Sequence, residues 1–339
     1  MRVQVNGRYL AQRITGMQRY ARQIVELLAD RFDVVRPAVG ATGPAGHAWE
    51  QFVLPARMNR GLLWSPSSTG PLGVRDQVVT IHDAAFVDQA QCFSRAFAAW
   101  YQWLVPRLAR RVRRIITVSE YSQERLAEYC RVPREKIVVI PSGVDPRFRP
   151  VKEAEVSVIR SRLGLPARYV LCVGSLEPRK NLARLLSAWK LLPYEPDGLQ
   201  LVLVGTKGRV FRDAELDTPR GVHWTGYLND DTLPAVYSGA ESFIFPSIYE
   251  GFGFPVLEAM ACGTPVICSG ATSLPEVAGD AALYVDPLDV ESIAHGIRTL
   301  AENPPLQRQM RTQGLSRAAT FTWQRAAAET WQTLEEARP

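Results

Sequence analysis

Residues 241–260 read ESFIFPSIYEGFGFPVLEAM and predict a strand, a glycine-containing loop and a helix in succession. The apolar run 243–246 is typical of a buried strand, and residues 256–261 follow a helical pattern. Two glycines in the loop 251–254 allow the backbone to approach a ligand closely. Pro255 suits the first turn of a helix, where free N–H groups and the positive end of the helix dipole bind phosphate. The stretch therefore predicts a phosphate-binding loop.

Two carboxylates flank this loop. Glu250 lies at its start, and Glu258 is expected in the first helical turn. Taken alone, Glu258 is explained as a charge that stabilises the helix dipole, and Glu250 as an ordinary loop acid. Together they place hydrogen-bond acceptors on both sides of the phosphate cradle, which suits the hydroxyl groups of a phosphate-linked sugar.

The composition is that of a globular protein long enough for two domains. Of its 339 residues, 46% are apolar and 22% are charged, and no apolar run approaches the roughly 20 residues of a membrane span. The first residues, MRVQVNGRYLAQ, alternate like a strand and contain no signal-peptide core. Five cysteines without CxxC spacing are expected to be reduced, and no His/Cys cluster has the spacing of metal ligands. These features predict a cytoplasmic protein without a bound metal.

The positive charge is concentrated in the first half of the chain. Residues 1–150 contain 22 Lys and Arg against 12 Asp and Glu, whereas residues 151–339 contain 18 against 22, within a formal net charge of +6. A basic half fits an anionic partner such as a membrane surface, a lipid-linked diphosphate or a nucleic acid. Nucleic acid is not expected, because no recognisable nucleic-acid module accompanies the charge.

A helix predicted within residues 93–116 carries aromatic and basic side chains at helical spacing, and Pro106 is expected to kink or divide it. Such a stripe suits an interfacial helix on anionic lipid, and it also fits a solvated basic face on a helix whose aromatic residues belong to the core. The residues of this basic stripe are Trp100, Trp103, Arg107, Arg110, Arg111 and Arg114.

Strands and helices alternate along the whole chain, which predicts parallel sheets covered on both faces by helices. The Pro- and Gly-punctuated segment 141–151 is expected to cross from one domain to the other, and the Gly- and Pro-rich segment 40–75 to form ligand-side loops. Strands are predicted at 2–5, 32–39, 78–81, 115–118, 136–140, 169–173, 200–204, 222–225, 243–246, 265–268 and 282–285.

His82 and Asp83 directly follow the predicted strand 78–81. The carboxyl ends of strands in a doubly wound sheet form its ligand crevice, so this pair is placed to contact a ligand. The alternatives are a structural histidine and an aspartate that begins a turn.

With these motifs the chain resembles the retaining glycosyltransferases of family 4. The donor site of that family resembles the segment 250–269, EGFGFPVLEAMACGTPVICS, in which Glu250 and Glu258 form an E-x7-E pattern. The segment 173–182, VGSLEPRKNL, resembles its second diphosphate-binding loop, and the segment 140–145, IPSGVD, its interdomain segment with Ser142 in place of the usual Asn. LPEVAG at 274–279 resembles the segment that follows the donor helix, so the resemblance covers essentially the whole chain.

The resemblance implies the GT-B fold, an α/β architecture of two Rossmann-like doubly wound domains that face a central cleft. We expect an acceptor-binding domain at residues 1–148, a nucleotide-sugar-binding domain at 149–318, and a C-terminal helix at 319–339 that packs back on the first domain. The segment 40–75 would then lie on the acceptor side.

The resemblance also implies roles for individual residues. Arg179 and Lys180 would hold the departing diphosphate, Glu258 would bind the ribose hydroxyls, and Glu250 and His82 would lie beside the transferred sugar. We therefore expect catalytic roles for Glu250, Lys180, Arg179 and His82. The remaining donor-binding candidates are Gly16, Ser142, Gly143, Gly174, Ser175, Phe252, Gly253, Phe254, Val256 and Leu257, and the acceptor-side candidates are Asp83 and Arg13.

The implied reaction is transfer of a hexose with retention of anomeric configuration and without an obligatory metal or other cofactor. The N-terminal pattern NGRYLAQRITGMQRYARQIVELL looks like the mannosyltransferase-B-like branch, whose members extend bacterial O-antigen and other surface polysaccharides on a lipid carrier. GDP-mannose is therefore the expected donor, with dTDP-rhamnose, GDP-fucose and UDP-sugars as alternatives. The expected acceptor is a glycan, free or linked to polyprenyl diphosphate, reached from the cytoplasm or from the inner face of the membrane.

Two other functions remain open from the sequence. One is an epimerase on the same fold, and the other is a non-catalytic scaffold for polysaccharide assembly. The RKNL loop and the paired glutamates favour transfer over both.

Overall fold

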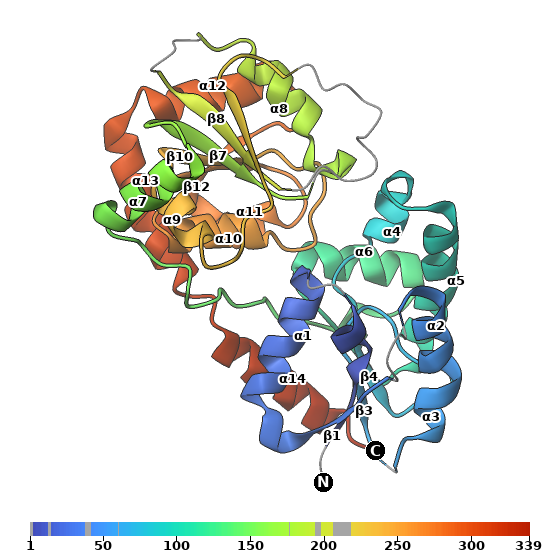
Figure 1. The fold of residues 1–339 in the computed structure, drawn as a ribbon. Coiled ribbons are helices and arrows are strands. Elements are labelled where there is room, and N and C mark those ends of the chain that lie inside the picture. Colours follow the sequence, from blue (N-terminus) through green and yellow to red (C-terminus); the bar gives the residue numbers. More distant parts are fainter. Residues whose placement is uncertain are drawn as a thin grey trace. The chain divides into compact units, whose positions relative to one another are not determined.

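A computed structural model describes residues 3–12, 15–37, 42–59, 61–175, 177–193, 198–205 and 218–339. The chain forms two compact units. The first contains residues 1–143 together with 322–339, and the second contains residues 144–321. Each unit is a parallel sheet with helices on both faces (Figure 1).

The first unit is built on a six-stranded sheet with the order β2-β1-β3-β4-β5-β6. Every neighbouring pair in it is parallel. Its strands are β1 (Val3–Asn6), β2 (Phe32–Val35), β3 (Leu63–Ser65), β4 (Gln77–Thr80), β5 (Arg114–Thr117) and β6 (Ile137–Val139).

Helices cover both faces of this first sheet, with α1 and α14 together on one of them (Figure 1). The α-helices are α1 (Gly16–Leu27), α2 (Gly43–Ala48), α3 (Leu54–Ala56), α4 (Ala85–Asp88), α5 (Arg95–Arg111), α6 (Glu120–Cys130) and α14 (Trp323–Glu336). A 3₁₀ segment, η1 (Gly7–Ala11), follows β1, and a π-helical segment, η3 (Trp49–Val53), joins α2 to α3.

The second unit is built on a parallel six-stranded sheet with the order β12-β11-β10-β7-β8-β9. Its strands are β7 (Tyr169–Val173), β8 (Gln200–Val204), β9 (Val222–Gly226), β10 (Ser242–Phe245), β11 (Val266–Ser269) and β12 (Ala282–Val285).

Helices α8 and α12 lie on one face of this second sheet and α9 and α10 on the other (Figure 1). The core between the sheet and the first pair contains Leu185, Ile244 and Ile297, all fully buried. The helices of the unit are α7 (Glu153–Leu163), the 3₁₀ segment η6 (Pro178–Lys180), α8 (Leu182–Trp189), α9 (Leu233–Ser238), α10 (Phe254–Ala261), α11 (Leu274–Ala278), α12 (Val290–Ala301) and α13 (Pro304–Ala318).

The structure corrects two predictions about the first half of the chain. The Gly- and Pro-rich segment 40–75 contains the helical segments α2, η3 and α3 and the buried strand β3, and not loops alone. Leu63 and Trp64 of β3 are fully buried, and this short apolar pair was hidden among turn residues in the sequence.

Pro106 does not divide α5, which runs through it as one helix. Proline has no N–H to donate to the carbonyl group four residues earlier, that of Gln102. The hydroxyl group of Tyr129 on α6 donates to that carbonyl oxygen at 3.3 Å. A side chain from the neighbouring helix therefore supplies the hydrogen bond that the proline removes.

The predicted α/β class with doubly wound sheets is confirmed. The order of strands changes direction between β7 and β10 in the second sheet and between β1 and β3 in the first. In open α/β sheets, ligands bind outside the carboxyl ends of the strands at such a switch point. The fold therefore marks one position in each unit where a site is expected.

Candidate functional site

In the second unit, the loops that follow β7 and β10 lie at the switch point of the sheet. The chain leaves β7 toward α8 on one face and leaves β10 toward α10 on the other (Figure 1). These loops carry Arg179, Lys180 and Glu250. The arrangement brings Glu250 next to two adjacent cations that precede it by about 70 residues in the sequence.

Glu250 forms ion pairs with both cations. Its Oε1 lies 2.6 Å from Lys180 Nζ, and its Oε2 lies 3.0 Å from Arg179 Nη1. The three side chains are only 8%, 14% and 19% exposed, in the order Glu250, Lys180, Arg179. Glu177 accepts a further hydrogen bond from Arg179 Nε at 2.7 Å. Two cations and two carboxylates therefore form one compact network.

The pKa values in this network follow from burial and charge. Burial alone raises the pKa of Glu250, but the positive charges of Lys180 and Arg179 outweigh it and lower that pKa below 4.5. Burial lowers the pKa of Lys180 below its ordinary value, while the charge of Glu250 acts in the opposite direction. At neutral pH the pair is charged, and Lys180 depends on Glu250 as its counter-ion.

Backbone hydrogen bonds join the two loops. The N–H of Ile248 donates to the carbonyl oxygen of Arg179 at 2.8 Å. Arg179 Nη1 also donates to the carbonyl oxygen of Tyr249 at 3.2 Å. The position of the two cations relative to Glu250 is therefore set by main chain as well as by charge.

Asn181 is a residue of this region that the sequence reasoning did not single out. It has a left-handed backbone conformation with φ of 62° and is 3% exposed. Its side-chain Nδ2 donates to the carbonyl oxygens of Pro246 at 3.0 Å and of Pro287 at 2.5 Å. Asn181 thus ties the loop after β7 to the loops after β10 and β12. The asparagine after Arg179 and Lys180 is the signal that could have indicated it, because asparagine tolerates the left-handed conformation.

Thr272 and Ser273, which follow β11, support the loop of Glu250. The Thr272 hydroxyl accepts a hydrogen bond from the Glu250 N–H at 3.1 Å. The Ser273 hydroxyl lies 2.9 Å from the carbonyl oxygens of Glu250 and of Phe252. No spacing in the sequence indicated these contacts, because they join segments more than 20 residues apart.

Glu258 lies in the second turn of α10 rather than in the first turn that the sequence predicted, because the helix begins at Phe254. It is 7% exposed, and its Oε2 accepts a hydrogen bond from the hydroxyl of Tyr237 at 3.1 Å. Tyr237 is itself fully buried and was not among the predicted site residues. Its hydroxyl orients Glu258, which therefore does not serve as a charge at the helix N-terminus.

The N-terminus of α10 is the position of the expected phosphate cradle. The N–H groups of Val256 and Leu257 both donate to the carbonyl oxygen of Gly253, at 3.0 and 3.2 Å, and Pro255 has no N–H. Val256 and Leu257 are fully buried, so their side chains belong to the core. Gly253 has φ of 118°, a conformation that favours glycine.

The aromatic residues of this loop pack within the unit. Phe252 is 5% exposed and contacts the ring of Phe254 edge-on, with the centroids 5.2 Å apart. This packing fixes the backbone of the segment that carries both glycines.

Gly174 and Ser175 follow β7. A Cβ on Gly174 would meet its nearest atoms at 3.9 Å, so this position has room for a side chain. The backbone of Gly174 instead lies close to Gly205, where a Cβ would be 1.9 Å from the carbonyl oxygen of Gly174. Ser175 is exposed, and its hydroxyl donates to Glu177 at 2.8 Å.

In the first unit, His82 lies two residues beyond the end of β4 and is 7% exposed. Its Nε2 lies 3.1 Å from the carbonyl oxygen of Pro66, so this nitrogen carries the proton. The ring of Tyr20 meets it edge-on at a centroid distance of 4.9 Å. Burial lowers the pKa of His82 to about 4, and the imidazole is therefore neutral at pH 7.

Asp83, Gly16 and Arg13 are further candidate residues of the first unit. Asp83 Oδ1 accepts a hydrogen bond from the N–H of Ala85 at 2.9 Å, as in a residue that begins a turn. Gly16 is exposed and is the first residue of α1, not a loop residue before it. Arg13 lies outside the described residues.

Ser142 and Gly143 lie where the chain leaves the first unit. Ser142 is 1% exposed, and within the described part of the chain its hydroxyl has no hydrogen-bond partner. A Cβ on Gly143 would lie 2.3 Å from the backbone nitrogen of Trp323. The glycine is therefore required by the close approach of the chain that begins α14.

The basic stripe is less uniform than the sequence predicted. Arg114 is the first residue of β5 and does not belong to the helix. Arg107 stacks on Trp103, with its guanidinium carbon 4.7 Å from the ring centroid, and Arg110 donates to the carbonyl oxygen of Cys130. Trp100 packs against the core and donates to His47 at 3.1 Å.

Among the described residues, no group of three or more His, Cys, Asp and Glu lies close enough together to hold a metal ion. Within the same residues, no helix is long and apolar enough to span a membrane.

Comparison with known proteins identifies the family. The model of glycosyl transferases group 1 matches residues 158–317, and the model of glycosyltransferase family 4 matches residues 63–148. The chain belongs to family 4 of the glycosyltransferases.

Two relatives with a curated function are mannosyltransferases. O-antigen chain mannosyltransferase B of Escherichia coli is 38% identical over 225 residues, which are 64% of this chain and 58% of that protein. MMP alpha-(1->4)-mannosyltransferase of Mycolicibacterium hassiacum is 34% identical over 250 residues, which are 70% of this chain and 58% of that protein. The chain thus spans just over half the length of each.

Solved structures resemble the chain over almost its whole length. Anabaena Alr3699/HepE in complex with UDP and glucose has a TM-score of 0.80 at 20% identity and covers 98% of this chain and 99% of its own. WaaG, a glycosyltransferase involved in lipopolysaccharide biosynthesis, has a TM-score of 0.77 at 17% identity and covers 98% and 99%. The fold is GT-B, as predicted.

Proposed function

We propose that the protein is a retaining glycosyltransferase that moves a hexose from a nucleotide sugar to a glycan acceptor. The observation that carries this proposal is the network of Arg179, Lys180 and Glu250 at the switch point of the second sheet. It places two cations at the position where doubly wound sheets bind phosphates.

In this proposal Arg179 and Lys180 stabilise the departing diphosphate. Cleavage of the sugar–phosphate bond increases the negative charge on the leaving group, so cations held in place bind the transition state more tightly than the donor. A guanidinium group grips two phosphate oxygens, and an ammonium group adds a point charge. The mutual hydrogen bonds of the loops hold both cations in position before the donor arrives.

The two glutamates serve different parts of the donor. Glu258, oriented by the Tyr237 hydroxyl, would accept hydrogen bonds from the ribose hydroxyls. Glu250, charged at neutral pH because of the two cations, would accept hydrogen bonds from the transferred sugar. The leaving phosphate would take the proton of the acceptor hydroxyl, so that no further base is required.

His82 would contribute as a neutral imidazole. With its Nε2 proton donated to Pro66, its Nδ1 is a hydrogen-bond acceptor for a sugar hydroxyl. The glycine-containing segments at Gly16, Gly143, Gly174 and Gly253, together with their neighbours Ser142, Ser175 and the backbone of residues 252–257, would complete the donor site. Asp83 and Arg13 would lie toward the acceptor.

The donor we propose is GDP-mannose. Support comes from the relatives named as mannosyltransferases, which include the O-antigen enzyme of Escherichia coli. The structural neighbour determined with UDP and glucose keeps UDP-sugars as an alternative, beside dTDP-rhamnose and GDP-fucose.

We further propose that the acceptor is a growing O-antigen or exopolysaccharide chain on polyprenyl diphosphate. The enzyme would then work in the cytoplasm, peripherally on the inner face of the membrane. The positive charge of the first half and the exposed Trp103 beside Arg107 support this location.

A donor panel tests the proposal. The protein is incubated with GDP-mannose, dTDP-rhamnose, GDP-fucose and UDP-hexoses, with and without EDTA, while thermal stability and slow nucleotide release are followed. Stabilisation by GDP-mannose alone, insensitive to EDTA, is the expected result. Stabilisation by another donor would change the proposed sugar but not the proposed reaction. No response to any donor would contradict the proposed transfer reaction and favour a non-catalytic scaffold.

A further inference from the structure

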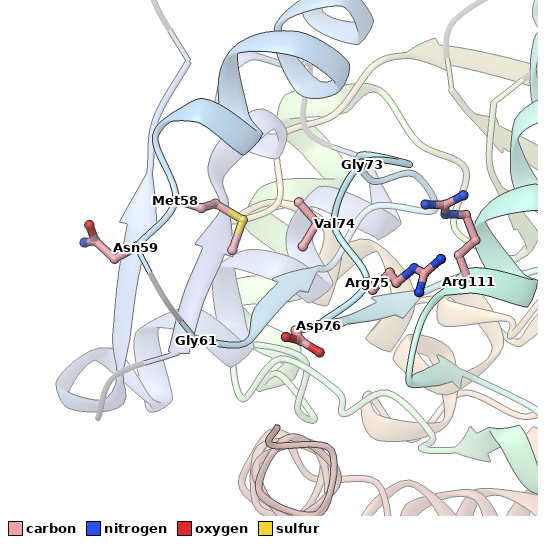
Figure 2. A pocket seen from close by; sticks show the side chains of 8 residues that line it. All are labelled: Met58, Asn59, Gly61, Gly73, Val74, Arg75, Asp76 and Arg111. Carbon is pink, nitrogen blue, oxygen red and sulfur yellow. The ribbon is translucent and has the colours of Figure 1, made fainter.

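A pocket of about 420 Å³ lies in the first unit and is lined by part of the segment 40–75 and by Arg111 of the basic stripe. Its lining comes from the segments that lead into β3 and β4 and from the end of α5, which leads toward β5. It therefore lies at the amino ends of adjacent parallel strands, the edge opposite to the carboxyl ends where His82 lies. The lining residues are Met58, Asn59, Gly61, Gly73, Val74, Arg75, Asp76 and Arg111 (Figure 2).

Two arginines dominate the charge of this pocket. Figure 2 shows the guanidinium groups of Arg75 and Arg111 on the same side of it. Both side chains are exposed, and within the described residues neither has an ion pair or a side-chain hydrogen bond. Two like charges at one opening repel each other, and an anion between them removes that repulsion.

The one carboxylate of the lining does not neutralise them. Asp76 Oδ1 accepts a hydrogen bond from Arg113 Nε at 2.8 Å. Its charge is therefore matched by a third arginine outside the lining, and among the described residues no carboxylate forms an ion pair with Arg75 or Arg111.

The lining also has an uncharged part. Met58 and Val74 present apolar surface, and Gly73 has open space where a side chain would project. A ligand that fits this pocket has an anionic group for the two guanidinium groups and a small uncharged part beside it. Planar guanidinium groups match the oxygen geometry of phosphate, so phosphate is the anion that the pair suits best.

We propose that this pocket binds a phosphate-bearing ligand through Arg75 and Arg111. The phosphate belongs either to the headgroup of an anionic lipid or to a small soluble phosphate. The site is independent of the proposed transfer reaction, since none of the residues placed in that reaction lines it.

The test measures binding, not turnover. Titration calorimetry with inorganic phosphate and co-sedimentation with vesicles of phosphatidylglycerol and phosphatidylcholine are performed on the full chain and on the double variant Arg75→Gln with Arg111→Gln. The matched control is Arg298→Gln with Arg308→Gln, which removes the same charge from exposed arginines of α12 and α13. Unchanged circular dichroism and melting temperature verify that both variants fold.

We expect the pocket variant to lose at least about tenfold in affinity for one of the two probes while the control stays close to the parent protein. Loss for inorganic phosphate supports a soluble phosphate as ligand, and loss for phosphatidylglycerol vesicles alone supports a lipid headgroup. Equal losses in the two variants, or no binding of either probe by the parent protein, would overturn the proposal.

Discussion

Replacing Glu250 by Gln is the most informative single change, because it removes the counter-ion of two mostly buried cations and keeps the side-chain volume. Removal of one partner from a buried ion pair costs about 3–5 kcal/mol. Arg179 and Lys180 retain 19% and 14% exposure, so solvent recovers part of this loss. We expect the free energy of unfolding to fall by about 2–4 kcal/mol at pH 7.

The pH dependence gives the sign of the effect. The pKa of Glu250 is lower in the folded protein than its ordinary value of 4.5. Its contribution to stability is therefore fully present above that value and is lost as the pH falls through the lowered pKa. The stability difference between the parent protein and Glu250→Gln should shrink accordingly below about pH 4.5.

Urea unfolding followed by circular dichroism measures this difference, and Glu153→Gln serves as the matched control. Glu153 is paired with Arg160 at 3.6 Å, but its side chain is 77% exposed. Removing its charge should cost less than about 1 kcal/mol. A Glu250 variant as stable as this control would refute the argument that the network is buried and coupled.

The same variant separates binding from chemistry. Both cations remain, so GDP should raise the melting temperature of Glu250→Gln at least as much as that of the parent protein. Turnover of the nucleotide sugar should fall by about 100-fold or more, because the group that orients the sugar is lost. Turnover like that of the parent protein would remove Glu250 from the proposed site.

Substitutions at three further residues test other parts of the proposed sites. Asn181→Ala should lower the free energy of unfolding by about 2–4 kcal/mol, because two hydrogen bonds are lost. Asn181→Gly should lower it by about 1 kcal/mol less, since glycine tolerates φ of 62°. Equal losses in urea unfolding would show that the backbone conformation is unimportant. Tyr237→Phe should raise the KM for the nucleotide sugar about 3- to 10-fold with kcat nearly unchanged. The rise in KM should be smaller for a donor that contains 2′-deoxyribose. Equal rises for both donors would contradict the idea that the Tyr237 hydroxyl orients Glu258 toward the ribose. The free energy of unfolding of the parent protein should fall as the pH falls from 6.5 to 4, because the unfolded chain binds a proton at His82 that the folded imidazole does not. His82→Gln should remove this dependence. A parent protein whose free energy of unfolding does not change over this range would contradict the lowered pKa of His82.

Much of the fold was predictable from local patterns. Alternating strands and helices predicted two parallel sheets, because β-propensity and helical periodicity are local properties. The roles expected of Arg179, Lys180 and Glu250 came from the resemblance to family 4, and they stay predictions. The motif order also predicted the family, which the family models confirm.

The errors fall where local signals compete with tertiary contacts. Strand β3 is only Leu63–Ser65, and turn residues on both sides concealed it, although its side chains are fully buried. Helix α5 continues through Pro106 because Tyr129 satisfies the carbonyl group of Gln102. Neither the burial of β3 nor the hydrogen bond from Tyr129 can be read from a short window of sequence.

The sequence by itself determined which residues carry charge and which segments form strands, loops and helices. Only the tertiary structure decided that Glu250 lies between two cations, that Tyr237 rather than the helix dipole holds Glu258, and that Asn181 joins three loops. The physical reason is distance along the chain. Hydrogen bonds and ion pairs act over a few ångströms, and residues separated by tens of positions reach that range only when the sheet brings the ends of its strands together.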